Sequence, residues 1–247
     1  MKLIKIPKIL HQTWKDHDLP EKFRIWQNSW IRHHPDWEHR FYTDDDCTAF
    51  IRQTFPGWLD IYKHYREPVQ RADLFRYLII YHCGGLYADM DMECFKPIDS
   101  LMEERFCLFS IEAYLTSGFQ KELDYPKPFQ VANCIFAAGP YHPFLDHILK
   151  RVKALSSLPI LNDNDVEETT GPLMLTRLFF NIPGDMESLV TLLPQINFMS
   201  PNVYPNIFPI NLNMYARHHC AGTWKKDKKK MGLKRRLIER NRLPGLL

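Results

Sequence analysis

The sequence predicts an α/β fold in which short strands alternate with helices. Three observations support this prediction. Residues 8–42 read as strand, helix and strand, residues 68–83 carry a clear helical pattern that ends at a glycine pair, and a strand pattern with two aspartates follows the glycines. Such alternation is typical of α/β proteins. With 247 residues and 45% hydrophobic content, the chain is long enough to bury the core of one large domain.

The first elements follow from hydrophobic periodicity. Residues 8–14 form a short apolar run that becomes polar at its end, as expected for an opening strand. Residues 21–33 place apolar side chains at roughly helical spacing, and residues 37–42 alternate as a second strand. Thr43 or Asp44 is expected to cap the helix that follows.

The helix after Pro68 is the clearest element of the chain. Proline is favoured in the first turn of a helix, and Gly84-Gly85 provides a stop signal. In the strand predicted after the glycines, the alternating pattern buries Leu86, Ala88 and Met90 and turns Tyr87, Asp89 and Asp91 to the other side. Further strands are expected at 106–110 and 131–137, and helices at 143–155 and 172–181.

Asp89 and Asp91 are the first candidates for chemistry. Two carboxylates separated by one residue at a strand end converge on one point, and such hard oxygen ligands suit Mg²⁺ or Mn²⁺ shared with phosphate oxygens. Asp73 and Arg76 lie three residues apart on the preceding helix, where they could contact sugar hydroxyls and phosphate oxygens. The alternative for this second pair is an ordinary surface ion pair.

Six segments carry a wider similarity: residues 6–14, 71–77, 81–91, 170–172, 204–205 and 215–224. Together they resemble glycosyltransferase family 32. That family includes yeast initiating α-1,6-mannosyltransferases, inositol-phosphoceramide mannosyltransferases and bacterial capsule-type enzymes, and it is distantly similar to clostridial glucosylating toxins. The six segments span residues 6 to 224 in the order that the family shows.

The resemblance implies a GT-A fold, which is a Rossmann-like α/β arrangement, over residues 1–224, followed by a basic tail at 225–247. It implies that Asp73 and Arg76 bind the donor sugar, that Tyr87 and Asp89 line the nucleotide and sugar, and that Asp91 binds the metal. Asp89, Asp91 and Arg76 are then the catalytic residues, with Mn²⁺ or Mg²⁺ as cofactor and a nucleotide sugar as donor.

The histidine-rich segment near residue 220 resembles the closing segment of the family. His218 is the expected second protein ligand of the metal, with His219 as its substitute, and a surface histidine pair is the alternative. Thr223 stands where the family usually has serine, so a hydroxyl for phosphate or metal contact is kept. Trp224 is expected to close over the diphosphate.

Two further assignments come from the same resemblance. Asn133 matches a family asparagine on the acceptor side, with a turn amide as the alternative. His11, Gln12 and Trp14 are expected near the nucleotide base, with core packing of Trp14 as the alternative.

The implied activity is a retaining hexose transfer from a UDP-sugar or GDP-mannose to a saccharide or glycolipid acceptor, which gives an α-linkage. The sequence does not nominate a nucleophile, so front-face departure of the diphosphate is the working hypothesis. One alternative is a sugar- or lipid-binding protein whose transferase site has decayed. A second is a phosphotransferase with Asp89 as nucleophile, but such motifs usually lie on the first strand.

The sequence also gives expectations about the location of the protein and about its partners. Neither a secretory signal nor a spanning helix is expected, and the six cysteines lack tight spacing, so free thiols and a cytoplasmic location are the expectation. After residue 224 there are ten Lys and Arg against two Asp and Glu. This leaves 22 basic against 27 acidic residues, a net charge of −5, for residues 1–224. Nucleic acid is not an expected partner, because no aromatic residue follows Trp224.

The basic tail is expected either to lie on the anionic inner face of a membrane or to be a solvated terminus. If it binds the membrane, the full chain will co-sediment with anionic vesicles more strongly than a chain of residues 1–224, and salt will weaken the difference. Neutral vesicles are the control. Equal sedimentation of the two chains would remove the membrane interpretation.

Overall fold

The computed structural model describes residues 3–199 and 213–222 and confirms the predicted α/β class. In the first half, the elements are β1 (Ile9–Thr13), α1 (Glu21–His33), β2 (Glu38–Tyr42), α2 (Asp44–Thr54), η1 (Pro56–Trp58), α3 (Leu59–His64), α4 (Pro68–Cys83), β3 (Gly85–Ala88), β4 (Met92–Cys94), α5 (Asp99–Met102) and β5 (Cys107–Tyr114). They continue with α6 (Ser117–Glu122), β6 (Phe129–Val131), β7 (Ile135–Ala138), α7 (Pro143–Leu155), α8 (Asp163–Thr169), α9 (Pro172–Phe180), α10 (Gly184–Glu187), β8 (Thr191–Leu193), η2 (Gln195–Asn197) and β9 (Ala216–His218).

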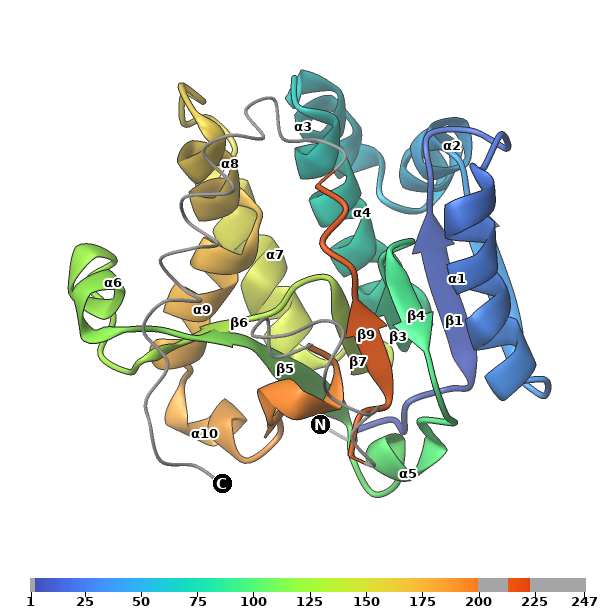
Figure 1. Ribbon diagram of the computed structural model, residues 1–247. Coiled ribbons are helices and arrows are strands. Elements are labelled where there is room, and N and C mark those ends of the chain that lie inside the picture. The colour runs from blue at the N-terminus through green and yellow to red at the C-terminus, as the bar shows by residue number, and fades with distance from the viewer. Residues whose placement is uncertain (1–2, 200–212, 223–247) are drawn as a thin grey trace.

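The central sheet has the strand order β2-β1-β3-β7-β5-β6, and β8 pairs with β5 (Figure 1). Strands β2, β1 and β3 run parallel, whereas β7 is antiparallel to both β3 and β5. The sheet is therefore mixed, and β8 adds a second parallel pair by running parallel to β5. The carboxyl ends of β1 and β3 lie together at one edge, as is typical of ligand sites in such sheets.

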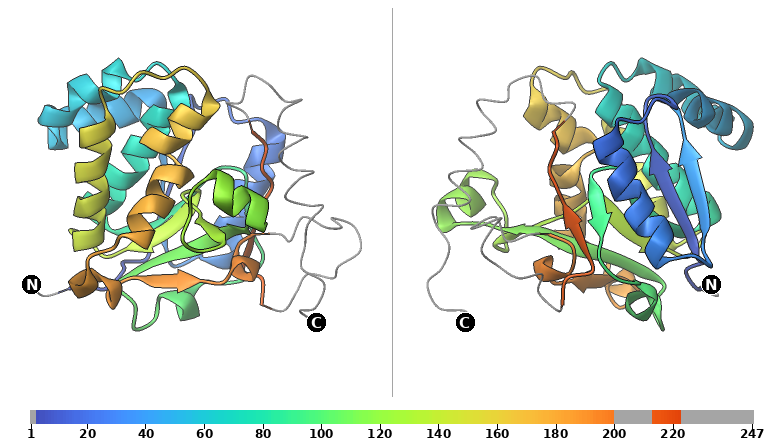
Figure 2. Two further views of the ribbon diagram at one scale, coloured as in Figure 1. Left: turned by 90° about the vertical axis from the view of Figure 1, so that its left-hand side faces the viewer. Right: turned by 45° about the vertical axis from the view of Figure 1, so that its right-hand side comes forward.

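Two hydrophobic cores cover the two faces of the sheet. On one face, α4, α7 and α9 pack against inward-pointing residues such as Tyr87, Phe109 and Phe136. On the other face, Trp30 of α1 packs with Leu86 and with β4 and β9. Figure 2 shows the helices of the first face standing together above the sheet. The predicted alternation of Leu86, Ala88 and Tyr87 is confirmed, because they point into opposite cores.

The predicted strand over residues 86–91 is too long, and its second face is not open. Strand β3 ends at Ala88 and is buried throughout, because it lies between β1 and β7 with a core on each side. Asp89, Met90 and Asp91 form a turn, closed by the Met92 N–H donating to the Asp89 carbonyl at 3.0 Å. The predicted strand at 131–137 is likewise divided into β6 and β7.

Helix α4 departs from the amphipathic pattern, because all residues from Asp73 to Ile80 are buried. It lies in the centre of the helical layer, against the sheet and beside α7 (Figure 1). The helix ends as predicted at the two glycines, where Gly84 has φ 67° and Gly85 has φ 105°. A Cβ on Gly85 would approach the Ile9 carbonyl oxygen to 2.5 Å, so only glycine fits this passage from helix to strand.

The small sheet formed by β4 and β9 lies beside α1 and carries the end of the described chain back to the turn after β3 (Figure 2). Met92 pairs with His218 and Glu93 with Arg217. The Trp30 indole donates to the Met92 carbonyl at 2.9 Å, which fixes β4 against α1. This ribbon brings residues more than 120 positions apart in the sequence into contact.

Three further expectations concern the cysteines, membrane-spanning helices and the C-terminal segment. All six cysteines are free in the structure. Among the residues described, no helix combines the length and apolar character needed to cross a bilayer. Tyr204-Pro205, Thr223, Trp224 and the basic tail lie outside the described residues.

Candidate metal and donor site

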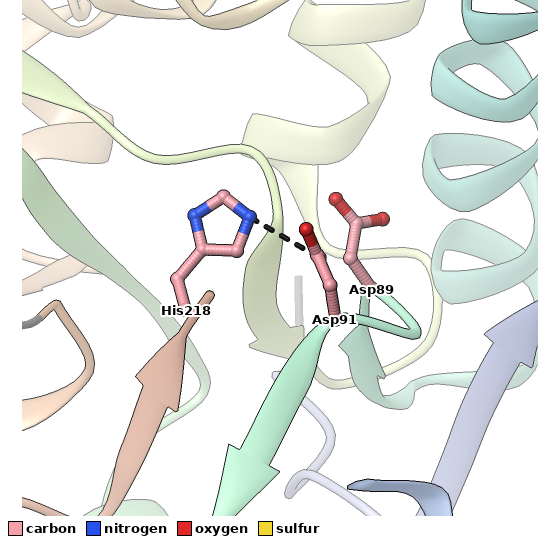
Figure 3. Close-up of side chains that lie close together, drawn as sticks. All are labelled: Asp89, Asp91 and His218. Atoms are coloured by element: carbon pink, nitrogen blue, oxygen red, sulfur yellow. Dashed lines mark ion pairs between the residues drawn. The ribbon is translucent and has the colours of Figure 1, made fainter. Parts of the chain in front are cut away.

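Asp89, Asp91 and His218 form the centre of the site (Figure 3). One ligand atom from each lies within 4.8 Å of the others, and all three side chains are half-buried. The aspartates come from the turn between β3 and β4, and the histidine comes from β9 directly opposite Met92. The predicted assembly of these three residues is therefore present in the structure.

The site is held together from the backbone upward. The Asp89 N–H donates to the Cys134 carbonyl at 2.8 Å, which ties the turn to the segment before β7. The Asp91 carbonyl accepts from the His219 N–H at 2.9 Å, and its Oδ2 accepts from the Ala221 N–H at 2.8 Å. Residues 218–221 are therefore anchored directly on the second aspartate.

His218 faces the aspartates, whereas His219 does not. The His218 Nε2 lies 3.2 Å from Asp91 Oδ1, but the His219 Nε2 lies 2.8 Å from Glu93 Oε2. The His219 ring also stacks on Trp26 of α1, with centroids 4.1 Å apart. The geometry thus favours His218 as the metal ligand and gives His219 a role in holding the segment in place.

Electrostatics distinguish the two aspartates. Burial raises the pKa of Asp89, although Arg76 opposes this rise. Burial also acts to raise the pKa of Asp91, but His218 and the Ala221 N–H outweigh it and hold this pKa below its usual value. Burial would lower the pKa of His218, yet Cys134 and Asp91 raise it well above its usual value. The pairing therefore favours the charged form of Asp91 and the protonated form of His218.

This donor set fits Mn²⁺ or Mg²⁺ by its chemistry. Two carboxylates supply hard oxygen ligands, and an imidazole adds a nitrogen ligand that Mn²⁺ accepts. To bind a metal, His218 would have to be a neutral imidazole, and the cation would then offset the charge of Asp91. Thr223, which was also predicted to contact the metal or a phosphate, lies outside the described residues.

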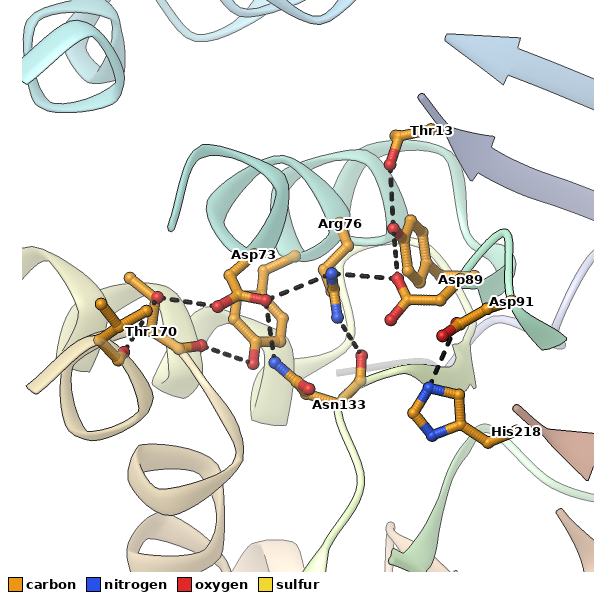
Figure 4. Close-up of polar contacts among 11 residues, drawn as sticks. Thr13, Asp73, Arg76, Asp89, Asp91, Asn133, Thr170 and His218 are labelled. Carbon is orange, nitrogen blue, oxygen red and sulfur yellow. Dashed lines mark hydrogen bonds and ion pairs between the residues drawn. The ribbon is translucent and has the colours of Figure 1, made fainter. Parts of the chain in front are cut away.

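Arg76 connects the aspartates to the interior (Figure 4). Its Nη2 lies 3.1 Å from Asp89 Oδ1 and 3.3 Å from Asp73 Oδ1, and its Nη1 donates to the Asn133 carbonyl at 2.8 Å. The guanidinium also lies over the Tyr87 ring, 4.7 Å from the centroid. The predicted alternative of a surface ion pair is wrong, because Asp73 and Arg76 are buried.

The other predicted donor residues lie at different depths. Tyr87 is buried beneath the turn, and its hydroxyl donates to Asp89 Oδ1 at 2.9 Å while accepting from Thr13 at 3.1 Å. Asn133, predicted on the acceptor side, donates its amide to Asp73 Oδ1 at 3.0 Å. These contacts place both residues inside the polar network, and their roles toward ligands stay predictions.

His11 and Gln12 of β1, and Trp14 directly after it, are buried or packed among other residues of the protein and do not contact the aspartates. His11 is fully buried, and burial lowers its pKa to about 4. It is neutral, so its Nε2 donates to the Gly84 carbonyl at 3.0 Å and its Nδ1 accepts from the Tyr42 hydroxyl at 3.2 Å. Trp14 packs on Phe23, and Gln12 is buried with its amide nitrogen unpaired. Contact of these residues with a base stays a prediction.

Sequence reasoning missed several residues that complete the network. Thr13 contacts the Tyr87 hydroxyl, Thr170 donates to Asp73, and Trp26 and Glu93 hold His219. Thr170 stood in a segment noted for its resemblance, but no local pattern indicated its partner. These pairings cross 74 to 193 positions of the sequence, which periodicity cannot reveal.

Comparison with known proteins now adds to this geometry. Residues 20–107 match the family described as the glycosyltransferase sugar-binding region containing the DXD motif. The chain is 32% identical over 171 residues to a mannosyl phosphorylinositol ceramide synthase of Saccharomyces cerevisiae, which covers 69% of this chain and 41% of that protein. It is also 32% identical over 179 residues to inositol phosphoceramide mannosyltransferase 1 of Schizosaccharomyces pombe, covering 71% of this chain and 51% of that protein. The chain thus spans about half or less of these relatives.

The fold has solved counterparts. The galactosyltransferase LgtC in complex with donor and acceptor sugar analogs superposes with a TM-score of 0.50 over 92% of this chain and 93% of that chain. The sequence identity is 13%, so this likeness concerns the fold. The predicted GT-A fold is confirmed.

The choice between the two histidines gives a direct prediction. His218→Gln will weaken Mn²⁺ binding at least about tenfold, because it removes one of three protein ligands. His219→Gln keeps a side-chain donor for Glu93 and will change Mn²⁺ affinity by less than about threefold. Electron paramagnetic resonance of free Mn²⁺ during titration measures both. A larger loss in the His219→Gln protein would reverse the assignment.

Proposed function

We propose that this chain, which belongs over residues 20–107 to the glycosyltransferases with a DXD-containing sugar-binding region, transfers a hexose from a nucleotide sugar with the help of a divalent cation. One observation carries this proposal. The DXD turn, His218 of β9 and the buried Asp73–Arg76 pair of α4 meet at one end of the sheet. A cation ligand set and a sugar-binding pair are therefore adjacent.

The proposed role of each residue follows from its position in the site. Asp91 and His218 hold the outer end of the site, where a diphosphate would share the cation. Asp89 lies between this end and Arg76, so it can serve the metal and the donor together. A bound Mn²⁺ or Mg²⁺ would offset the charge that develops on the departing diphosphate. Asp73, at the inner end, offers carboxylate oxygens to sugar hydroxyls.

Retention at the anomeric carbon, with an α-linked product, remains part of the proposal and rests on the family resemblance. The environment of Asp89 does not suit a nucleophile. Its Oδ1 is already bonded to the Tyr87 hydroxyl and paired with Arg76, which lowers its reactivity toward carbon. This bonding also argues against the phosphotransferase alternative. Front-face departure of the diphosphate is therefore the mechanism that we favour.

Mannose and a glycolipid acceptor are the first substrates to test. One relative described above is named a mannosyl phosphorylinositol ceramide synthase and the other an inositol phosphoceramide mannosyltransferase, and the DXD turn lies within the family match at residues 20–107. The donor is proposed as GDP-mannose or a UDP-hexose, and the acceptor as a glycolipid or a saccharide. An association with the inner face of an anionic membrane, through the basic tail, is proposed as the way to reach a lipid acceptor.

The test is a donor screen with the purified full chain. Mn²⁺-dependent transfer or hydrolysis is expected with one nucleotide sugar, and EDTA will abolish it. Asp91→Ala will lower turnover by at least about 100-fold, since it removes a metal ligand and the carboxylate oxygen that accepts from the Ala221 N–H. Asp185→Ala, on the exposed helix α10, is the control and will retain activity.

The outcome also decides between an enzyme and a decayed binding protein. Metal-dependent nucleotide binding without turnover on any donor would support a decayed site. The absence of turnover on every donor would defeat the proposed transfer, and the additional absence of metal-dependent nucleotide binding would defeat the nucleotide-sugar site as well.

A further inference from the structure

The junction between α8 and α9 is bonded to α4 at three points. Gln70 Nε2 donates to Thr169 Oγ1 at 3.0 Å, Thr170 Oγ1 donates to Asp73 Oδ2 at 2.9 Å, and the Tyr77 hydroxyl donates to the Thr170 carbonyl at 3.0 Å. The α4 partners are spaced by three and four residues, so they share one helix face. All five residues are buried, with exposed fractions of 3% or less.

The two oxygens of Asp73 have different partners. Oδ1 accepts from the Asn133 amide and faces Arg76, both of which belong to the polar network around the DXD turn. Oδ2 accepts from the hydroxyl of Thr170 (Figure 4). The Thr170 hydroxyl has one proton, and the Val166 carbonyl, at 3.4 Å, is a poorer acceptor than the carboxylate. The single proton is therefore directed at Asp73.

The hydroxyl has two effects on this carboxylate. It fixes the rotation of the carboxylate plane, because the two oxygens are bonded from opposite sides. It also favours the charged form: burial raises the pKa of Asp73 to about 6, and Arg76, Thr170 and Asn133 all act against this rise. Without the hydroxyl, Oδ2 would be a buried oxygen without a partner, which is costly.

We infer that Thr170 is a positioning residue for the donor sugar, acting through Asp73. It holds the carboxylate in the orientation in which its remaining lone pairs meet a sugar hydroxyl. Asp73 and Asp89 both pair with the Arg76 guanidinium. By fixing Asp73, the bond from Thr170 therefore also holds the sugar-binding carboxylate in place relative to the metal ligand Asp89. This inference rests on the proposed function, in which Asp73 contacts the transferred hexose.

The chain provides a matched control for this role. Thr170→Val removes the hydroxyl and keeps the branched shape, while Thr170→Ser keeps the hydroxyl. Thr169→Val removes an equally buried hydroxyl one residue earlier, which bonds to Gln70 and to carbonyls of α8 and not to Asp73. A general loss of packing or stability would affect both valine variants alike.

The experiment compares steady-state transfer, with the donor found by the screen, against calorimetric binding of the matching nucleoside diphosphate in Mn²⁺. Thr170→Val will lower donor kcat/KM by at least about tenfold, with most of the loss in kcat. Its nucleoside diphosphate affinity will stay within about twofold, because the metal end is intact. Thr170→Ser will recover most of the activity, and Thr169→Val will stay within about threefold of the wild type.

Two results would overturn the inference. If both valine variants lose the same activity, the hydroxyl of Thr170 has only a structural role. If nucleoside diphosphate affinity falls together with transfer, the effect does not act through the sugar. A wild type without transfer would defeat the proposed function and this role with it, whereas an active wild type with an equally active Thr170→Val protein would defeat the role alone.

Discussion

The site depends on one buried guanidinium. Arg76 is 4% exposed, and its planar fork reaches Asp73, Asp89 and the Asn133 carbonyl from a single position on α4. The buried carboxylate of Asp73 and the half-buried one of Asp89 would repel each other and tend to bind protons without a cation between them. Removal of one partner from such a buried cluster typically costs about 3–5 kcal/mol. The position of the DXD turn therefore depends on α4 as much as on β3.

The fold supplies this arrangement by bringing three distant segments to one edge of the sheet. The glycine pair after α4 returns the chain directly into β3, so Arg76 and Asp89 come from consecutive elements. The β4–β9 ribbon adds His218 from near the end of the described chain, and Trp26 and Glu93 hold its neighbour His219. The junction between α8 and α9 contributes Thr170, whose hydroxyl donates to Asp73. The helices and strands thus set where the backbone of each site residue lies, and the bonds between distant segments set how its side chain is oriented.

Much of the fold could be predicted from the sequence, wherever the sequence pattern involves only a few neighbouring residues. Helices α1 and α7 begin and end at the predicted residues, and Thr43 caps α2 as expected, because periodicity, proline and cap residues act over a few positions. The strand before the aspartates was predicted too long, since the chain turns at Asp89, and its burial on both faces comes from the two cores that cover the sheet. The burial of Asp73 and Arg76 was missed for a related reason, because a helix at the centre of a layer does not keep a polar face. The bond from Thr170 to Asp73 crosses 97 positions and has no local signature.

The claim that one guanidinium organises both ends of the site is tested most directly by Arg76→Lys, measured as Mn²⁺-dependent transfer per folded protein. A lysine keeps the charge, but one ammonium group cannot reach two carboxylates and a carbonyl in the geometry of the fork. We predict a loss in kcat/KM of at least roughly 30-fold, or about 2 kcal/mol. Arg177→Lys, which alters a bidentate pair with Glu168 on α8, will keep wild-type transfer. Wild-type kcat/KM in the Arg76→Lys protein would contradict the account.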